Sequence, residues 1–134
     1  MTNPDPETIV REAKTIAVVG LSNDPEKPSN EVGGYLKEQG YRIIPVNPKE
    51  EEVLGERAYE TVEQIPEEVD VVDVFLPSEK TPEAAEDAVR AGAKTLWLQE
   101  GIESEEARRI AGEGGLAYIE NWCMRKTHEG LHNG

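Results

Sequence analysis

The residues most suited to chemistry follow a short apolar run near the start of the chain. Gly20 closes the run 15–20 and permits a sharp turn that brings backbone N–H groups close to a ligand. Leu21 follows, and Ser22 and Asn23 then add a hydroxyl and an amide donor. A glycine turn followed by polar donors is typical of phosphate binding, so we expect a phosphate group at this loop.

A helix is expected after the loop, with Ser29 or Asn30 as its N-cap and Gln39 near its end. The positive end of this helix near Ser29, together with Lys27, would strengthen phosphate binding. An ordinary strand-to-helix turn without a ligand is an equally good interpretation of the loop alone. The pair Gly33–Gly34 inside the helix indicates close packing on the sheet or, alternatively, close approach of a ligand.

The type of nucleotide is constrained by what the loop lacks. A dinucleotide fingerprint needs glycines two and five residues after Gly20, where the chain has Ser22 and Pro25. The second strand ends in Asn47, Pro48 and Lys49 rather than in the acid that would hold the ribose hydroxyls of NAD. A cation there favours a phosphorylated ribose, as in NADP or coenzyme A. Alternatively, Lys49 is only a surface charge beside the acidic run 50–52.

The single cysteine, Cys123, lies close in sequence to Arg125 and Lys126, which could favour a reactive thiolate. Packing beside Trp122 is the more common role of such a residue. His128 and His132 have i, i+4 spacing, but Gly130 lies between them, so no metal pair is expected there. Asp70 and Asp73 share one predicted strand and face opposite sides of it, so they form no carboxylate pair.

Alternating apolar runs and helical segments position these residues. Strands are expected at 15–20, 41–46, 69–76, 94–98 and 115–119, with a weak one at 56–59. Helices are expected from about residue 5 to Lys14 and at 29–39, 61–65, 81–92 and 104–111. This alternation predicts a single doubly wound, Rossmann-like α/β domain with a mostly parallel sheet of five to six strands and helices on both faces. The core would span about 8–124, followed by an extended or frayed tail at 125–134.

Ligands of such sheets bind outside the carboxyl ends of the strands. The other loops at that edge begin at Asn47, Leu76 and Gln99. We therefore expect these segments to meet the loop after Gly20 on one rim.

Charge and composition exclude several classes of function. The 134 residues carry a formal net charge of −14 and no basic stripe, so nucleic-acid binding is not expected. No apolar run is long enough to span a membrane, and no export signal is apparent, so we expect a cytoplasmic protein. The excess of Glu over Asp, with few Asn, Gln, Cys and Met, is a weak indication of a thermophilic source.

Several segments together resemble a known family, the stand-alone CoA-binding proteins. They are similar in turn to the N-terminal CoA-binding domain of the succinyl-CoA synthetase alpha subunit. The resemblance covers about residues 8–124. Its segments are Ala17–Ser22, Lys27–Ser29, Ile44–Pro48, Val71–Phe75 and Gly92–Gly101.

The resemblance implies a role for each loop of the rim. The loop Gly20–Asn23 would hold the CoA pyrophosphate, and Lys49 would match a lysine that contacts phosphate or ribose. Leu76 and Pro77 would pack near the adenine or the pantetheine. The segment Gln99, Glu100 and Gly101 would lie along the pantetheine arm.

One departure from the synthetase pattern is Asn23, which stands where the synthetase has glycine; asparagine tolerates the left-handed conformation better than most residues. The histidine that the synthetase phosphorylates belongs to another domain, so ligase activity is not implied.

The function expected from the sequence is binding of CoA or an acyl-CoA without catalysis. An enzyme that uses an NADP-type nucleotide, or that acts on acyl-CoA through Cys123, is the alternative. A third interpretation is a domain that needs a protein partner or a second copy of itself.

Overall fold

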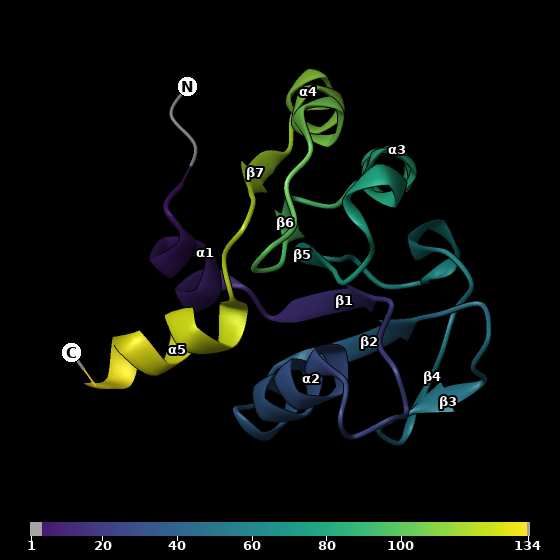
Figure 1. Ribbon diagram of the computed structural model, residues 1–134, viewed down its shortest axis with the longest axis vertical. Coiled ribbons are helices and arrows are strands. Elements are labelled where there is room, and N and C mark those ends of the chain that lie inside the picture. The colour runs from purple at the N-terminus through teal and green to yellow at the C-terminus, as the bar shows by residue number, and fades with distance from the viewer. Residues whose placement is uncertain (1–3, 134) are drawn as a thin grey trace.

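The centre of the computed structural model is a parallel sheet whose strands lie in the order β2-β1-β5-β6-β7 (Figure 1). The structure describes residues 4–133, and the side chains of residues 4–131. The strands of this sheet are β1 Thr15–Val19, β2 Arg42–Val46, β5 Val71–Val74, β6 Thr95–Leu98 and β7 Ala117–Ile119. The α/β class predicted from the alternating apolar runs is thus confirmed.

Helices cover both faces of the sheet, as its strands, buried on both sides, require. α3 (Thr81–Ala91) and α4 (Glu105–Glu113) lie together on one face, where they bury alanines such as Ala85 and Ala107. α1 (Pro6–Glu12), α2 (Pro28–Glu38) and α5 (Met124–Asn133) lie on the other face (Figure 1). The core is therefore two apolar layers separated by the sheet.

The strand order reverses beside β1. The chain leaves β1 through α2 and returns as β2 on one side, and it then crosses to form β5 on the other side of β1. At such a switch point the loops that follow the two central strands diverge and leave a crevice at the carboxyl ends of the strands. The crevice here lies between the loops after β1 and β5.

The C-terminal segment is a helix, which corrects the frayed tail expected from the sequence. Met124, Thr127 and His128 are buried, and Leu131 packs against the same cluster as Met124. The His128 ring accepts or donates a hydrogen bond of 2.7 Å to the Tyr35 hydroxyl of α2. Packing of this amphipathic face outweighs the cost of Gly130, which is about 1 kcal/mol of helix propensity.

Several predicted boundaries shift. α2 begins at Pro28 and ends at Glu38, with Lys27 and not Ser29 or Asn30 as its N-cap, because proline is favoured in the first helical turn. The segment expected as a strand at 56–59 contains only β4 (Glu56–Arg57), which pairs antiparallel with β3 (Glu52–Val53).

Two of the expected helices differ from the prediction, one in its type and one in where it ends. The helix expected at 61–65 is a 3₁₀ turn, η1 (Val62–Gln64), and a second turn, η2 (Ser78–Lys80), precedes α3. Lys14 lies beyond the end of α1.

The outer edge of β2 is already occupied. Pro45 stands within this edge strand and has no backbone N–H. Its carbonyl accepts a hydrogen bond of 3.0 Å from Tyr59 N, and Tyr59 O accepts one of 2.8 Å from Asn47 N. The opposite edge strand, β7, is only three residues long. Within residues 4–133, no helix has the length and apolar character needed to cross a membrane.

Candidate functional site

A cavity of about 840 Å³ opens across the carboxyl ends of β1, β5 and β6. Its walls are the start of α2 and the first turns of α5. It is therefore located in the crevice that the reversal of strand order creates. The lining residues are Gly20, Ser22, Lys27, Pro28, Ser29, Glu31, Val32, Phe75, Leu76, Pro77, Gln99, Glu100, Ile102, Cys123, Arg125, Lys126 and Glu129.

Gly20 is required by the fold at this turn. Its φ is +86°, and a Cβ atom there would lie 2.5 Å from the carbonyl oxygen of Phe75. Its backbone N–H donates to Val46 O at 2.8 Å and is not free for a ligand. Gly20 thus seats the loop against the end of β5, and any phosphate must be held by the residues that follow it.

The loop after Gly20 is fastened to α2. The Ser29 hydroxyl accepts a hydrogen bond of 3.1 Å from Ser22 N, and Asn30 Nδ2 donates to Ser22 O at 2.8 Å. The residues expected as N-caps therefore hold the loop instead. The backbone N–H groups of Leu21 and Asn23 have no hydrogen-bond partner among the described residues. Leu21 is fully buried, so of these two donors only the N–H of the exposed Asn23, close to the start of α2, is open to an anion.

Cations gather around the cavity, although the molecule as a whole is acidic. Arg125 of α5 pairs with Glu31 of α2, and its Nε lies 3.5 Å from Glu129. Lys126 Nζ lies 2.9 Å from Glu100 Oε1, and this hydrogen bond raises the pKa of the lysine. Lys27, in contrast, has no ion-pair partner within the described part of the chain. It is the lining cation whose charge is not offset by a neighbouring acid.

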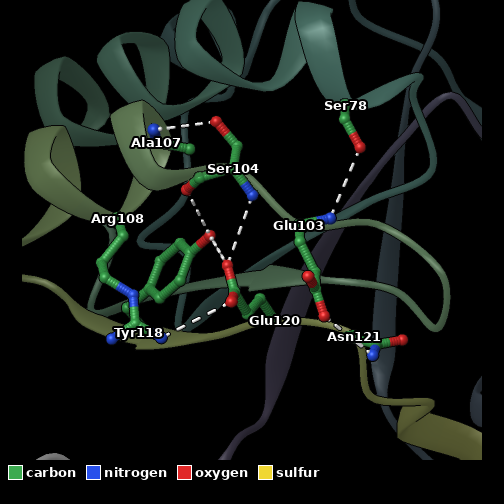
Figure 2. A network of polar contacts seen from close by, with 8 residues as sticks. All are labelled: Ser78, Glu103, Ser104, Ala107, Arg108, Tyr118, Glu120 and Asn121. Atoms are coloured by element: carbon green, nitrogen blue, oxygen red, sulfur yellow. Dashed lines mark hydrogen bonds and ion pairs between the residues drawn. The ribbon is translucent and has the colours of Figure 1, made fainter.

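The wall that follows β6 is held by a polar network (Figure 2). The Tyr118 hydroxyl donates to Glu120 Oε1 at 2.8 Å and to Ser104 O at 3.1 Å, which joins β7 to the start of α4. Burial, together with the bond to Glu120, raises the pKa of Tyr118. Asn121 Nδ2 donates to Glu103 Oε2 at 3.0 Å, which closes the network from β7 to the loop after β6.

Asn121 also receives a hydrogen bond of 2.6 Å from Gly101 N. The loop between β6 and α4, with Gln99 and Glu100 at its start, is therefore fixed before any ligand binds. This fixed loop forms the wall of the cavity nearest α5.

Gln99 is 5% exposed and points its side chain toward α5. Its Oε1 accepts a hydrogen bond of 3.3 Å from Met124 N. Its Nε2 has no hydrogen-bond partner among the described residues. It remains in contact with solvent, because among those residues only the two Asp73 carboxyl oxygens are both unpartnered and fully buried. The Nε2 group is therefore available as a hydrogen-bond donor at the cavity wall.

Asp73 lies in β5, fully buried, with Val18 and Trp97 beside it in the sheet register. Both of its carboxyl oxygens lack a hydrogen-bond partner. Burial raises the pKa of Asp73 well above its ordinary value, which favours the neutral form of the side chain. Asp70, as expected, forms no pair with it: Asp70 lies before β5 and accepts hydrogen bonds from Lys14 N and Thr15 N.

Eight of the residues predicted for the site line the cavity, and six do not. Those that line it are Gly20, Ser22, Lys27, Ser29, Leu76, Pro77, Gln99 and Glu100. Those that lie outside its lining are Leu21, Asn23, Asn47, Pro48, Lys49 and Gly101.

The reasons for this difference lie in side-chain directions. Leu21 points into the core, and Asn23 Nδ2 donates to Glu52 O at 2.9 Å, away from the cavity. Asn47 Nδ2 donates to Leu21 O at 3.0 Å and so supports the loop from behind. Lys49 follows Asn47 on the surface, where its role toward a ribose phosphate stays a prediction.

The lining residues outside the predicted site set come from α2, from α5 and from the segments after β5, β6 and β7: Pro28, Glu31, Val32, Arg125, Lys126, Glu129, Phe75, Ile102 and Cys123. Arg125, Lys126 and Glu129 were assigned to a frayed tail, and Phe75 to the buried part of a strand. The spacing of Met124, Thr127, His128 and Leu131 on one helix face is the signal that would have placed α5 on the domain. The side chain of His132 lies outside the described residues. Among the described residues, no group of three or more acids, histidines and cysteines is arranged to hold a metal ion.

Comparison with known proteins identifies relatives of two kinds. The family model described as "CoA binding domain" matches residues 14–129. An uncharacterised protein of Bacillus subtilis is 37% identical and is covered over 97% of its length, with 96% of this chain aligned. A solved structure of a hypothetical protein from Pyrococcus horikoshii is 43% identical, has a TM-score of 0.93 and covers 99% of this chain and 94% of that one.

The second kind of relative is much longer than this chain. The alpha subunit of an ADP-forming acetate–CoA ligase from Pyrococcus furiosus is 36% identical over 87% of this chain. The chain spans 28% of the length of that subunit.

Proposed function

Because the chain belongs to the CoA binding domain family, we propose that its cavity binds coenzyme A or an acyl-CoA, with the pyrophosphate at the loop after β1. The observation that carries the proposal is Lys27, a cavity-lining cation at the start of α2 that has no ion-pair partner among the described residues, in the same loop as the unpartnered N–H of the exposed Asn23. A backbone donor close to a helix start, with one unpaired cation, is suited to a pyrophosphate.

The remaining walls suit the rest of such a ligand. Phe75, Leu76 and Pro77 provide an apolar surface at the end of β5, and Gln99 offers an amide donor farther along the cavity. A pantetheine arm combines methyl and methylene groups with amide carbonyls, so it requires both kinds of surface. Adenosine would extend toward the end of β2, where Lys49 could meet its 3′-phosphate.

We propose binding without catalysis as the basal role, in a single domain whose core includes α5. The similarity to acetate–CoA ligase subunits supports a CoA site, since those enzymes are named for CoA. It extends over only 28% of the length of the ligase subunit. Ligase activity is therefore not part of the proposal.

Isothermal titration with CoA, acetyl-CoA, NADP and ATP tests the ligand. We expect CoA and acetyl-CoA to bind more tightly than NADP or ATP, because only they carry the pantetheine arm. Binding of NADP in the absence of CoA binding would contradict the proposal.

Three charge-reversal variants test the location. Lys27→Glu should weaken CoA about tenfold or more, because it replaces a phosphate-facing cation with an anion. Lys49→Glu should weaken CoA more than dephospho-CoA. Lys14→Glu, at the opposite edge of the sheet, changes the net charge by the same amount and should leave binding nearly unchanged. Equal losses in all three variants would indicate a general charge effect rather than a site.

A further inference from the structure

Cys123 lines the cavity at the beginning of α5 and is partly exposed. Its carbonyl accepts hydrogen bonds from Thr127 N at 3.0 Å and from Thr127 Oγ1 at 2.8 Å, so it directly precedes the first turn of this ten-residue helix. A negatively charged sulfur would therefore meet the positive end of the helix dipole and the nearby ammonium of Lys126.

Gln99 is an independent sign of a ligand at the same end of the cavity. Although only 5% of the residue is exposed, its Nε2 donor has no partner among the described residues. Its Oε1 is held by Met124 N, the residue next to Cys123, which fixes the direction of the amide. A fixed and unpaired donor in a nearly buried side chain is suited to donate a hydrogen bond to a ligand carbonyl oxygen.

We infer that Cys123 is a thiol–disulfide exchange site that forms a mixed disulfide with the thiol end of CoA, while Gln99 Nε2 positions the arm through one of its amide carbonyls. The inference rests on the proposed binding of CoA. The loop after β1 and Cys123 line the same cavity, and β5 lies between β1 and β6, whose following residue Gln99 contacts the start of α5. A ligand anchored by its phosphates would thus present its sulfur near Cys123.

The exchange requires the ligand as a disulfide, and the simplest co-reactant is the symmetrical disulfide of CoA. The Cys123 thiol loses its proton to solvent, and the thiolate attacks one sulfur of the disulfide. A bond forms between Cys123 Sγ and that sulfur, and the ligand's S–S bond breaks. The electron pair leaves with the second CoA as a thiolate, which takes up a proton. One disulfide is exchanged for another, so no further oxidant is needed.

Intact-protein mass spectrometry during incubation with CoA disulfide tests the inference. We expect one CoA adduct per chain, removed by a reducing agent and absent in Cys123→Ser. The reaction should be about tenfold or more faster than with oxidised glutathione, because binding in the cavity presents the disulfide at high effective concentration.

A relocated cysteine is the matched control. The double variant Cys123→Ser/Glu105→Cys places the thiol in the first turn of α4, an exposed helix start outside the cavity. It should react with CoA disulfide and oxidised glutathione at similar rates. Gln99→Glu keeps the acceptor for Met124 N and removes the donor. This variant should react with CoA disulfide more slowly than the wild-type protein does. Its rate with a small neutral disulfide, dithiodipyridine, should equal that of the wild-type protein.

Titration of the wild-type protein with reduced CoA separates the two proposals. If CoA binds but Cys123 shows no preference for CoA disulfide over oxidised glutathione, the exchange site is wrong and the binding function stands. If CoA does not bind, the proposed function is wrong and the inference with it. Preference for CoA disulfide, lost in the relocated cysteine, supports both.

Discussion

At the scale of single residues, Asp73 is the side chain most at odds with its surroundings. It occupies a strand position whose neighbours in the sheet are Val18 and Trp97, and it is fully buried without a hydrogen-bond partner. A neutral carboxyl in such a place loses its hydration without compensation. Asp73 therefore lowers stability, and the loss depends on pH.

The sign of this dependence follows from the raised pKa of Asp73. Above about pH 4 the unfolded chain releases the proton that the folded chain retains. The contribution of Asp73 to the free energy of unfolding is thus greatest at low pH and is lost as the pH rises toward the folded pKa. We expect Asp73→Val to stabilise the fold by about 1–3 kcal/mol at pH 7 and by less at pH 4.

Urea denaturation of both proteins at several pH values measures the difference. Because the other acidic groups are the same in both proteins, their titration cancels in the difference between the two free energies of unfolding. A stability difference that does not change between pH 4 and pH 7 would contradict the burial of a neutral carboxyl.

The sequence alone predicted the turn after β1, because a glycine that ends an apolar run is a strong local signal. It could not give side-chain directions. Asn23 turns toward Glu52, and Leu21 turns into the core, through contacts with residues far along the chain. It also could not show that Gly20 is needed for the approach of Phe75, since that contact joins two strands.

At the scale of elements, the glycine pair in α2 separates into two roles. A Cβ atom on Gly33 would lie 3.0 Å from Leu21 Cδ1, whereas one on Gly34 would have no neighbour within 4 Å. Of the two interpretations left open by the sequence, close packing therefore accounts for Gly33. No contact accounts for Gly34.

We expect opposite effects from alanine at these two positions. Gly34→Ala should raise the free energy of unfolding by about 0.5–1 kcal/mol, because alanine favours the helix. Gly33→Ala should lower it by about 1 kcal/mol, because its methyl group crowds Leu21 in a packed core. Chemical denaturation gives both values, and equal stabilisation by the two alanines would disprove the close packing of Gly33.

α5 was the element that sequence reasoning missed. The glycine at 130 and the closeness of the sequence end favoured a frayed segment, although the apolar spacing of a helix was present. Its stability depends on contacts with α1 and α2, among them the bond between His128 and Tyr35. Such contacts between distant segments are not encoded in local propensity. As a result, the sequence indicated Cys123 as a candidate nucleophile but did not place it in the wall of the cavity.

At the scale of the whole molecule, the charge of −14 opposes an anionic ligand. The cavity offsets this only locally, since Arg125 and Lys126 are paired with acids and Lys27 is not. Attraction at the loop and repulsion by the molecule act over different distances. Salt screens the long-range repulsion first, because it extends beyond the Debye length of about 8–10 Å.

We therefore expect the association rate of CoA to rise with ionic strength between low and physiological salt. Stopped-flow fluorescence of Trp122, which is 51% exposed beside Cys123, can measure it. Dephospho-CoA carries less charge and should show a weaker salt dependence. A rate that falls with added salt would mean that the local cations dominate the approach of the ligand.

The protected edges of the sheet bear on how the chain behaves when crowded. Pro45 leaves a gap in the donors of β2, and the Tyr59 segment occupies its neighbouring groups, while β7 offers only three residues. A strand from another molecule finds no continuous row of free N–H and C=O groups to join. Pairing of copies through the edges of the five-stranded sheet is thereby disfavoured.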